Sequence, residues 1–388
     1  MEKELKAPKL RFPGFTDDWE QRKVFDIANR YDNLRVPVAA NLRVKGTTPY
    51  YGANGIQDYV LGFTHEGEFI LVAEDGANDL QNYPVNYVNG RIWVNNHAHV
   101  LQGKESIAHN RFLSYSISKA NIESVLVGGG RAKLNAEVMM NLDLMLPSYD
   151  EQEKIGKYFS NLDNLITLHQ RKFETLKKLK KGFLQKMFPK NGESVPEIRF
   201  PGFTDAWEQR KVSEITTSYS GGTPKSGTAE YYDGNIPFIR SGEIYSNKTE
   251  LFITELGLNN SSAKMVHVGD ILYALYGATS GEVSRAKLDG AINQAILAVL
   301  PNEEINADFL VEWFRKEKEN IIATYLQGGQ GNLSAQIIKD LMVDIPSSGE
   351  QKKIGDYFTN LNNLITLHQR KLDILKKLKQ GMLQQMFI

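Results

Sequence analysis

Apolar residues recur at spacings of three and four in two long segments of the chain, which predicts two long helices. The pattern continues through Leu179 and Phe183 in the first segment and through Leu378 and Met382 in the second, and it is typical of a coiled coil. About 38 residues at ~1.5 Å each give a length of about 57 Å. Because the linker 191–196 is short compared with this length, we expect the two helices to pair antiparallel. The predicted seam is Ile155, Phe159, Leu162, Ile166, His169, Phe173 and Leu176 in the first helix, and Ile354, Phe358, Leu361, Ile365, His368, Leu372 and Leu375 in the second.

The segments before these helices have shorter patterns, which alternate between strand-like runs and turn glycines. Apolar and β-branched runs predict strands, and one run with helical spacing predicts a shorter helix at 308–322. The fold class is therefore expected to be α+β. The expected strands include 68–73, 85–94, 271–275 and 292–299.

The chain repeats itself. Residues 11–24 return as 199–212 with one change, and residues 147–188 return in closely similar form as 346–387. Within the variable segments, Asn96-His97-Ala98 aligns with Asn293-Gln294-Ala295. Two copies of one fold with different surfaces suggest two related binding tasks. The predicted organisation is an N-terminal anchor at 1–24, a first variable domain at 25–146, a helix at 147–190, a linker with the repeated anchor at 191–212, a second variable domain at 213–345 and a helix at 346–388.

Composition excludes several classes of protein. The 388 residues are 41% hydrophobic and 24% charged, which fits two or three folded domains and excludes general disorder. The absence of cysteine excludes disulfides, thiol catalysis and cysteine-bound metals. Without an apolar run of membrane-spanning length or an apolar signal core, we expect a soluble, cytoplasmic protein with no membrane partner.

Charge is unevenly distributed although the net charge is zero. The variable segments carry net charges of −2 (25–149) and −7 (213–349), whereas the helices carry +5 (150–190) and +4 (350–388). Lysines gather in the second half of each helix, where they form a solvated flank, contact phosphates or bind a partner protein.

No catalytic signature occurs, so we assign no catalytic residue. Phosphate loops, nucleophile elbows, zinc-hydrolase motifs and an adenine-methyltransferase motif are all missing. His97 and His99, two apart on a predicted strand, are expected to share a face, with a polar surface favoured over a metal site. His169 and His368 occupy equivalent seam positions, and a buried pair that fixes helix register is favoured over a pH switch or a metal pair.

Polar loops in both variable segments carry groups that can contact base edges or phosphates. We therefore treat them as candidate DNA contacts. In the first segment the candidates are Arg35, Asn41, Arg43, Lys45, Asn54, Gln57, Arg131 and Lys133, and in the second they are Lys225, Ser226, Arg240, Ser241, Thr279, Ser280, Gln330 and Asn332.

The combination of repeats resembles the specificity subunit of type I restriction-modification systems, and the resemblance spans nearly the whole chain. Each long helix opens after Pro-Ser with Glu-Gln and closes with a Met-Phe pair, and a Trp-Glu anchor precedes each variable segment. The residues that carry it are Pro147-Ser148, Glu151-Gln152, Ile155, Met187-Phe188 and Trp19-Glu20, their copies Pro346-Ser347, Glu350-Gln351, Ile354, Met386-Phe387 and Trp207-Glu208, and Gly221-Gly222-Thr223-Pro224.

The resemblance implies a non-catalytic subunit. Each variable segment would be a target recognition domain for one half of a bipartite, asymmetric site in double-stranded DNA. The helices would set the spacer and dock two modification subunits. It also implies that S-adenosylmethionine is bound by those subunits, which methylate adenine N6, and that ATP and Mg²⁺ are used by a restriction subunit that can join.

Two other functions remain open at this stage. The chain could supply DNA recognition to another modification system, such as a type IIB-like enzyme. It could also be a coiled-coil adaptor that binds protein or glycan through its variable domains.

Overall fold

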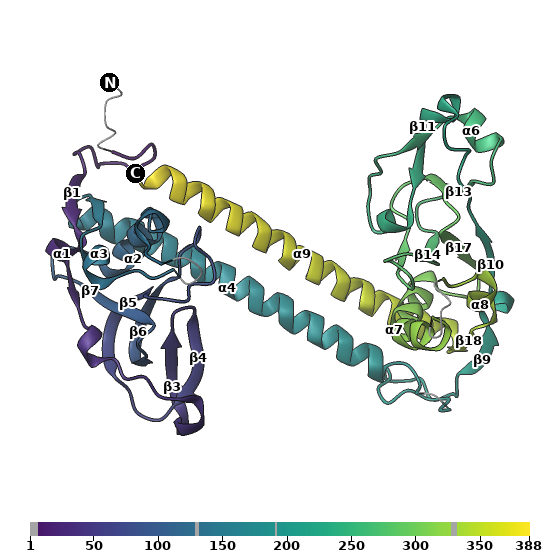
Figure 1. The fold of residues 1–388 in the computed structure, drawn as a ribbon. Helices are drawn as coiled ribbons and strands as arrows, with labels where there is room; N and C mark the ends of the chain where they lie inside the picture. The colour runs from purple at the N-terminus through teal and green to yellow at the C-terminus, as the bar shows by residue number, and fades with distance from the viewer. Residues whose placement is uncertain (1–6, 129–131, 191, 327–331) are drawn as a thin grey trace. The chain divides into compact units, whose positions relative to one another are not determined.

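The computed structural model describes residues 7–128, 132–190, 192–326 and 332–388 (Figure 1). Contacts divide the chain into two compact units. Unit 1 comprises Met1–Gln170 and Arg370–Ile388, and unit 2 comprises Arg171–Gln369. Each unit therefore contains one variable segment, the first part of the helix that follows it and the last part of the other helix. In the part of the chain described, no helix combines the length and apolarity needed to cross a membrane.

Unit 1 is built around a six-stranded sheet in the order β2-β7-β5-β6-β3-β4, and β1 pairs separately with β8. All but one of its strand pairs are antiparallel; β3 and β6 run parallel. The elements are β1 (Glu20–Lys23), α1 (Val24–Ile27), β2 (Ala28–Arg30), β3 (Lys45–Gly52), β4 (Gly55–Val60), β5 (His65–Ala73), β6 (Val85–Val94), β7 (Ala98–Gly103), α2 (Asn110–Lys119), α3 (Ala136–Met140), β8 (Asp143–Leu146) and α4 (Tyr149–Lys186).

Unit 2 has two four-stranded sheets, β10-β17-β14-β15 and β12-β11-β16-β13, and a β9-β18 pair. Its parallel pair, β11 with β16, corresponds to β3 with β6 in unit 1. The elements are β9 (Glu208–Lys211), α5 (Val212–Ile215), β10 (Thr216–Ser220), β11 (Tyr232–Ile239), β12 (Phe252–Ile253), α6 (Glu255–Asn259), β13 (Lys264–Val266), β14 (Ile271–Ala274), β15 (Val283–Arg285), β16 (Gly290–Ile292), β17 (Ile296–Pro301), α7 (Ala307–Tyr325), α8 (Ala335–Asp340), β18 (Met342–Ile345) and α9 (Ser348–Met386).

The two long helices, α4 with 38 residues and α9 with 39, are confirmed, and they run antiparallel within each unit. In unit 1, Phe159 lies 5.9 Å from Phe387 between ring centroids, and Asp163 Oδ1 lies 2.5 Å from Lys379 Nζ. Residues with higher numbers in α4 thus contact residues with lower numbers at the C-terminal end of the chain, as in an antiparallel pair. In unit 2, Lys180 and Phe183 meet residues near the start of α9 in the same antiparallel sense.

The predicted seam is buried or half-buried at every position. Its continuation is confirmed at Phe183 and Met382, which pack against the cores, but it is wrong at Leu179 and Leu378, whose exposed fractions are 42% and 38%. The side chains that face the opposite helix one position later are Lys180 and Lys379. A straight helix advances 3.6 residues per turn, so the contact face drifts away from a strict heptad after several turns.

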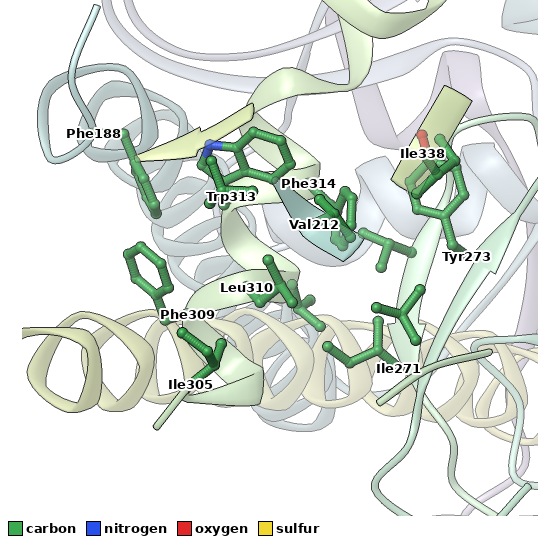
Figure 2. Packing of buried hydrophobic residues seen from close by; sticks show 14 of the residues in the cluster. Phe188, Val212, Ile271, Tyr273, Ile305, Phe309, Leu310, Trp313, Phe314 and Ile338 are labelled. Carbon is green, nitrogen blue, oxygen red and sulfur yellow. The ribbon is translucent and has the colours of Figure 1, made fainter. Parts of the chain in front are cut away.

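In each unit the main core lies where the variable segment meets the helices. In unit 2, Phe188, just after the end of α4, stacks on Phe309 of α7 at 5.4 Å (Figure 2). Phe188 also contacts Trp207 of the anchor edge-on. In unit 1, Phe387 stacks on Phe112 of α2 at 5.4 Å and contacts Trp19 in the same way. In each unit, the phenylalanine of a Met-Phe repeat therefore packs against the tryptophan of a Trp-Glu repeat. We call this contact the aromatic joint.

The Glu-Gln repeat joins three elements at the first turn of each long helix. Glu151, fully buried, accepts two hydrogen bonds from the Arg11 guanidinium at 2.9 and 2.7 Å. Gln152 accepts from the His109 N–H at the start of α2 and donates to the carbonyls of Ile107 and Pro147. Arg199, Glu350 and Gln351 repeat this arrangement in unit 2.

Other predictions of local structure are partly confirmed. Strand 85–94 is found with the expected bounds, and the helix at 308–322 is found as α7. The strand expected at 292–299 is confirmed only in its second half, because β16 ends at Ile292 and β17 begins at Ile296. The corresponding helix α2 in the first segment was not predicted.

The predicted alignment of Asn96-His97-Ala98 with Asn293-Gln294-Ala295 is displaced by one residue. Asn95 Oδ1 accepts from the His97 N–H, and Asn293 Oδ1 accepts from the Ala295 N–H. Asn95 and Asn293 are therefore the equivalent residues, and His97 corresponds to Ala295. The neighbouring asparagines make the two alignments hard to distinguish from sequence alone.

We expect Glu151→Gln to lower the free energy of unfolding by about 3–5 kcal/mol, because it leaves the Arg11 guanidinium largely buried without a carboxylate. Denaturant unfolding measures this loss. Glu153→Gln, an exposed change on the same helical turn, is the control and should cost little. An equal, small loss for both variants would contradict the role given to the ion pair.

Candidate nucleic-acid interface

Loops at equivalent edges of the two units gather many of the candidate residues. This edge is formed by the ends of β3 and β5 and the start of β7 in unit 1, and by the ends of β11 and β14 and the start of β17 in unit 2. The bridges Asp75↔Lys133 and Tyr276↔Asn332 close it in equivalent places. We call these surfaces edge 1 (residues 52–57, 74–78, 95–97 and 132–133) and edge 2 (residues 220–226, 240–243, 276–280, 293–295 and 332).

In edge 1, side chains hold the loops to one another. Asn54 donates through Nδ2 to the Gly76 carbonyl at 2.9 Å and accepts from the Asn78 N–H at 3.0 Å. His97 Nδ1 lies 2.5 Å from Asp75 Oδ1. Asn54, Gln57 and Lys133 are exposed, so their outer surfaces are available to a ligand.

An ionic network underlies edge 1. Arg35 Nη1 donates to Glu74 Oε2 at 2.7 Å, and Lys133 Nζ lies 2.9 Å from Glu74 Oε1. His99, 1% exposed, makes hydrogen bonds at both ring nitrogens, to Asp32 Oδ2 at 2.7 Å and to the Leu134 carbonyl at 2.9 Å. Both ring nitrogens therefore face hydrogen-bond acceptors.

Burial alone would raise the pKa of Asp32. The hydrogen bond and charge of His99, the Val100 N–H and the nearby Arg35 outweigh burial and lower this pKa below its ordinary value of 3.8. In unit 2 the residues equivalent to Glu74 and His99 are Leu275 and Leu297, both buried. The polar interior is thus specific to unit 1.

Edge 2 is built on different chemistry. Gly221 and Gly222 pass close to the Ile292 carbonyl and to Ser262, where a Cβ would approach within 2 Å of an oxygen. In the residues that follow these glycines, Thr223 Oγ1 donates to Gln294 Oε1 at 2.5 Å, and Lys225 and Ser226 are exposed. Thr279 is partly exposed and Asn332 is exposed on the same edge.

Arg240 and Ser241 lie at the end of β11 and the start of the following 3₁₀ turn. The Arg240 guanidinium donates to Glu243 at 2.8 Å and to Glu250 at 2.9 Å, and its side chain remains 40% exposed. Burial would raise the pKa of Glu243, but the hydrogen bonds from Arg240 and two backbone N–H groups lower it to about 2. Arg240 is thereby held in a fixed orientation.

Not all candidates come together at these edges. Lys45 lies opposite Val60, at the other end of the β3-β4 hairpin from Asn54, and Asn41 and Arg43 precede it. Arg35 and Arg43 are each only 15% exposed and paired with carboxylates, and Ser280 is 9% exposed and donates to the Gly277 carbonyl. These three side chains shape loops and offer little free surface. Arg131 and Gln330 lie outside the described residues.

The expectation that His97 and His99 share a face is wrong. His97 precedes β7 and its side chain is 37% exposed, whereas His99 points into the interior. They bind different carboxylates, so they do not converge on one point. His169 and His368 are half-buried at the predicted seam positions, and their role as a register pair stays a prediction.

Sequence reasoning missed several residues of the two edges. Asp75, Tyr276 and Gln294 hold the loops together, and Asp32 organises the charges beneath edge 1. Asp75 lies two residues after the predicted strand 68–73 and Tyr276 directly follows the predicted strand 271–275, and this position was the available signal. Their pairing across distant segments had no signal in a single sequence.

The arrangement defines a duplicated α+β module on paired helices, with one loop edge per module. The family model for the type I restriction modification DNA specificity domain matches residues 16–178 and again 204–377. The chain therefore belongs to the type I restriction-modification DNA specificity family.

Similar proteins cover almost the whole chain. A protein of Haemophilus influenzae named as a type I restriction enzyme specificity subunit is 31% identical over 359 residues, 89% of each chain. A type I restriction enzyme specificity subunit of Methanocaldococcus jannaschii is 23% identical over 403 residues, 96% of this chain and 92% of that protein. The crystal structure of a type I restriction-modification S subunit from M. genitalium has the same fold, with a TM-score of 0.75, 16% identity and coverage of 98% and 99%.

We expect Asp32→Asn to lower the free energy of unfolding at pH 7 by about 3 kcal/mol. A carboxyl group whose pKa is lowered by folding stabilises the folded protein at pH values above its ordinary pKa. This stabilisation is lost as the pH falls through the lowered pKa. The difference between wild type and variant should therefore shrink below pH 3.8. Denaturant unfolding from pH 7 to 3 measures it, with exposed Glu105→Gln as control; a difference independent of pH would contradict the assignment.

Proposed function

We propose that the chain is the DNA-recognition subunit of a type I restriction-modification complex, and that edges 1 and 2 each contact one half of a bipartite, asymmetric DNA site. The observation that carries this proposal is the pair of equivalent edges with different chemistry on one repeated frame. Equivalent positions give both modules the same way of approaching DNA. Different side chains, such as Lys133 against Asn332, give each module its own sequence preference.

The exposed groups of the edges are suited to this task. Asn54, Gln57 and Lys133 in edge 1, and Lys225, Arg240 and Asn332 in edge 2, present amide and cationic donors. The acidic partners of Arg240 keep its guanidinium oriented before DNA binds, which reduces the entropy cost of the contact.

Family membership supports the remaining roles in this proposal. The proposed partners are double-stranded DNA, two modification subunits that bind S-adenosylmethionine, and a restriction subunit that uses ATP and Mg²⁺. This chain binds none of these cofactors itself in the proposal, and it acts in the cytoplasm. The paired helices α4 and α9 connect the modules and set the spacer between the half-sites.

The decisive experiment is a methylation map. The chain is coexpressed with its modification subunit in a host free of adenine methylation, and N6-methyladenine is located by sequencing. We expect a split, asymmetric motif methylated once on each strand. If the complex assembles but yields no sequence-specific methylation or footprint, the proposal is wrong and an adaptor function is favoured.

A second arm of the map tests the spacer. Seven residues inserted at equivalent positions of α4 and α9 lengthen each helix by about 10.5 Å, close to three base pairs at ~3.4 Å each. Both half-sites should be retained with a spacer about three base pairs longer. An unchanged spacer contradicts the role of the helices as a ruler.

Substitutions in the edges should affect the half-sites separately. We expect Lys133→Ala to weaken recognition at one half-site and Lys225→Ala at the other, each by ~1–3 kcal/mol for a base contact. Competition binding with sites altered in one half measures the effect. Lys157→Ala, an exposed change in the first half of α4, is the matched control. A loss that is uniform across DNA sequences would identify a phosphate contact instead.

A further inference from the structure

A three-residue polar joint connects each variable segment to the long helices, and its chemistry differs between the units. In unit 1 it comprises Tyr115 of α2, Asp163 of α4 and Lys379 of α9. In unit 2, it comprises Glu312 of α7, Asn362 of α9 and Lys180 of α4. Asp163 and Asn362, and likewise Lys379 and Lys180, are equivalent in the long repeat. The starts of α2 and α7 make Tyr115 equivalent to Glu312, because His109 and Asn306 both bind the repeated glutamine.

In unit 1, the central residue of the joint only accepts. Tyr115 Oη donates to Asp163 Oδ2 at 2.6 Å, and Lys379 Nζ donates to Asp163 Oδ1 at 2.5 Å. The Lys379 ammonium also lies 5.2 Å from the centroid of the Tyr115 ring. A carboxylate accepts from both groups and pairs with the ammonium, whereas an asparagine at this position would leave Lys379 without a carboxylate in the joint and make the Tyr115 hydroxyl accept instead of donate.

In unit 2 the central residue must both accept and donate. Asn362 accepts from Lys180 Nζ through Oδ1 at 2.8 Å and donates through Nδ2 to Glu312 Oε1 at 3.0 Å. Glu312 is 2% exposed and pairs with Lys180 at 3.1 Å and with Arg315. A carboxylate at position 362 would place two acceptors in contact at a buried site.

Each joint therefore holds its lysine-binding carboxylate in a different place, on the helix after the variable segment in unit 1 and within the variable segment in unit 2. The lysines are equivalent and cannot distinguish the two arrangements. Beside the tyrosine, the aspartate is the carboxylate that the lysine needs, whereas the glutamate already supplies a carboxylate and requires the asparagine. This match links a variable segment to the helix that directly follows it.

We infer that Tyr115 with Asp163, and Glu312 with Asn362, are matched pairs that determine which recognition module can be seated on which helix. A recognition module that is moved from one unit to the other must therefore carry more than residues 25–146 or 213–345. It must also carry position 163 or 362 of the helix that follows it. This inference rests on the geometry of the joints and holds whether or not the modules contact DNA as proposed.

The test uses one substitution in two full-length chains. The first is the natural chain, and the second is a hybrid in which residues 25–146 also replace residues 213–345. In the natural chain, we expect Asn362→Asp to lower the midpoint of thermal unfolding by about 5–10 °C, because it opposes Glu312. In the hybrid, the same substitution should raise the midpoint by a similar amount, because it supplies the carboxylate that Lys180 otherwise lacks. A shift of the same sign in both chains overturns the inference.

A double-mutant cycle in unit 1 gives the answer without a hybrid. Tyr115→Glu and Asp163→Asn should each lower the midpoint, and the double variant should recover most of the loss because it reproduces the joint of unit 2. Lys376→Gln, an exposed change on α9, is the control for charge alone. Strictly additive losses would show that the two positions are independent and would overturn the inference.

Discussion

The buried ion pair at the first turn of each long helix is the interaction on which the rest of the architecture depends. Glu151 and Glu350, almost fully excluded from water, are each held by one arginine of a short anchor that lies far away in sequence. The adjacent glutamine fixes the start of α2 or α7. Since an unpaired carboxylate at such a site is costly, anchor, variable segment and helix are fixed together. The aromatic joint completes this frame with the end of the other helix.

The repeated anchors and long helices form a constant frame. This frame permits the interiors and edges of the two units to differ. In unit 1, Asp32, Arg35, Glu74 and His99 form an ionic network, and unit 2 has leucines at the positions of Glu74 and His99. Networks of this kind and apolar cores of similar volume can be close in stability, so either is tolerated if all partners are present. The loops above are free to differ because their positions depend on the frame.

The polar joints limit that freedom. Tyr115 with Asp163 and Glu312 with Asn362 show that one boundary between frame and variable segment is chemically matched. At a partly buried polar contact, each donor must meet an acceptor, whereas the apolar contacts around it have no such requirement. Edges 1 and 2 can change one residue at a time, whereas a polar joint must change two residues together.

The sequence by itself determined the duplication, the bounds of the frame, the two long helices and the apolar seam, because these leave periodic or repeated signals in neighbouring residues. It also indicated the loops of both edges, although it could not separate exposed Lys225 from internally paired Arg35. Tertiary structure alone decided that Lys180 and Lys379 replace Leu179 and Leu378 at the helix contact, that His97 and His99 face apart, and that distant residues such as Asp32 and His99 meet. These features depend on helix drift, side-chain direction and contacts between remote segments, none of which a local pattern encodes.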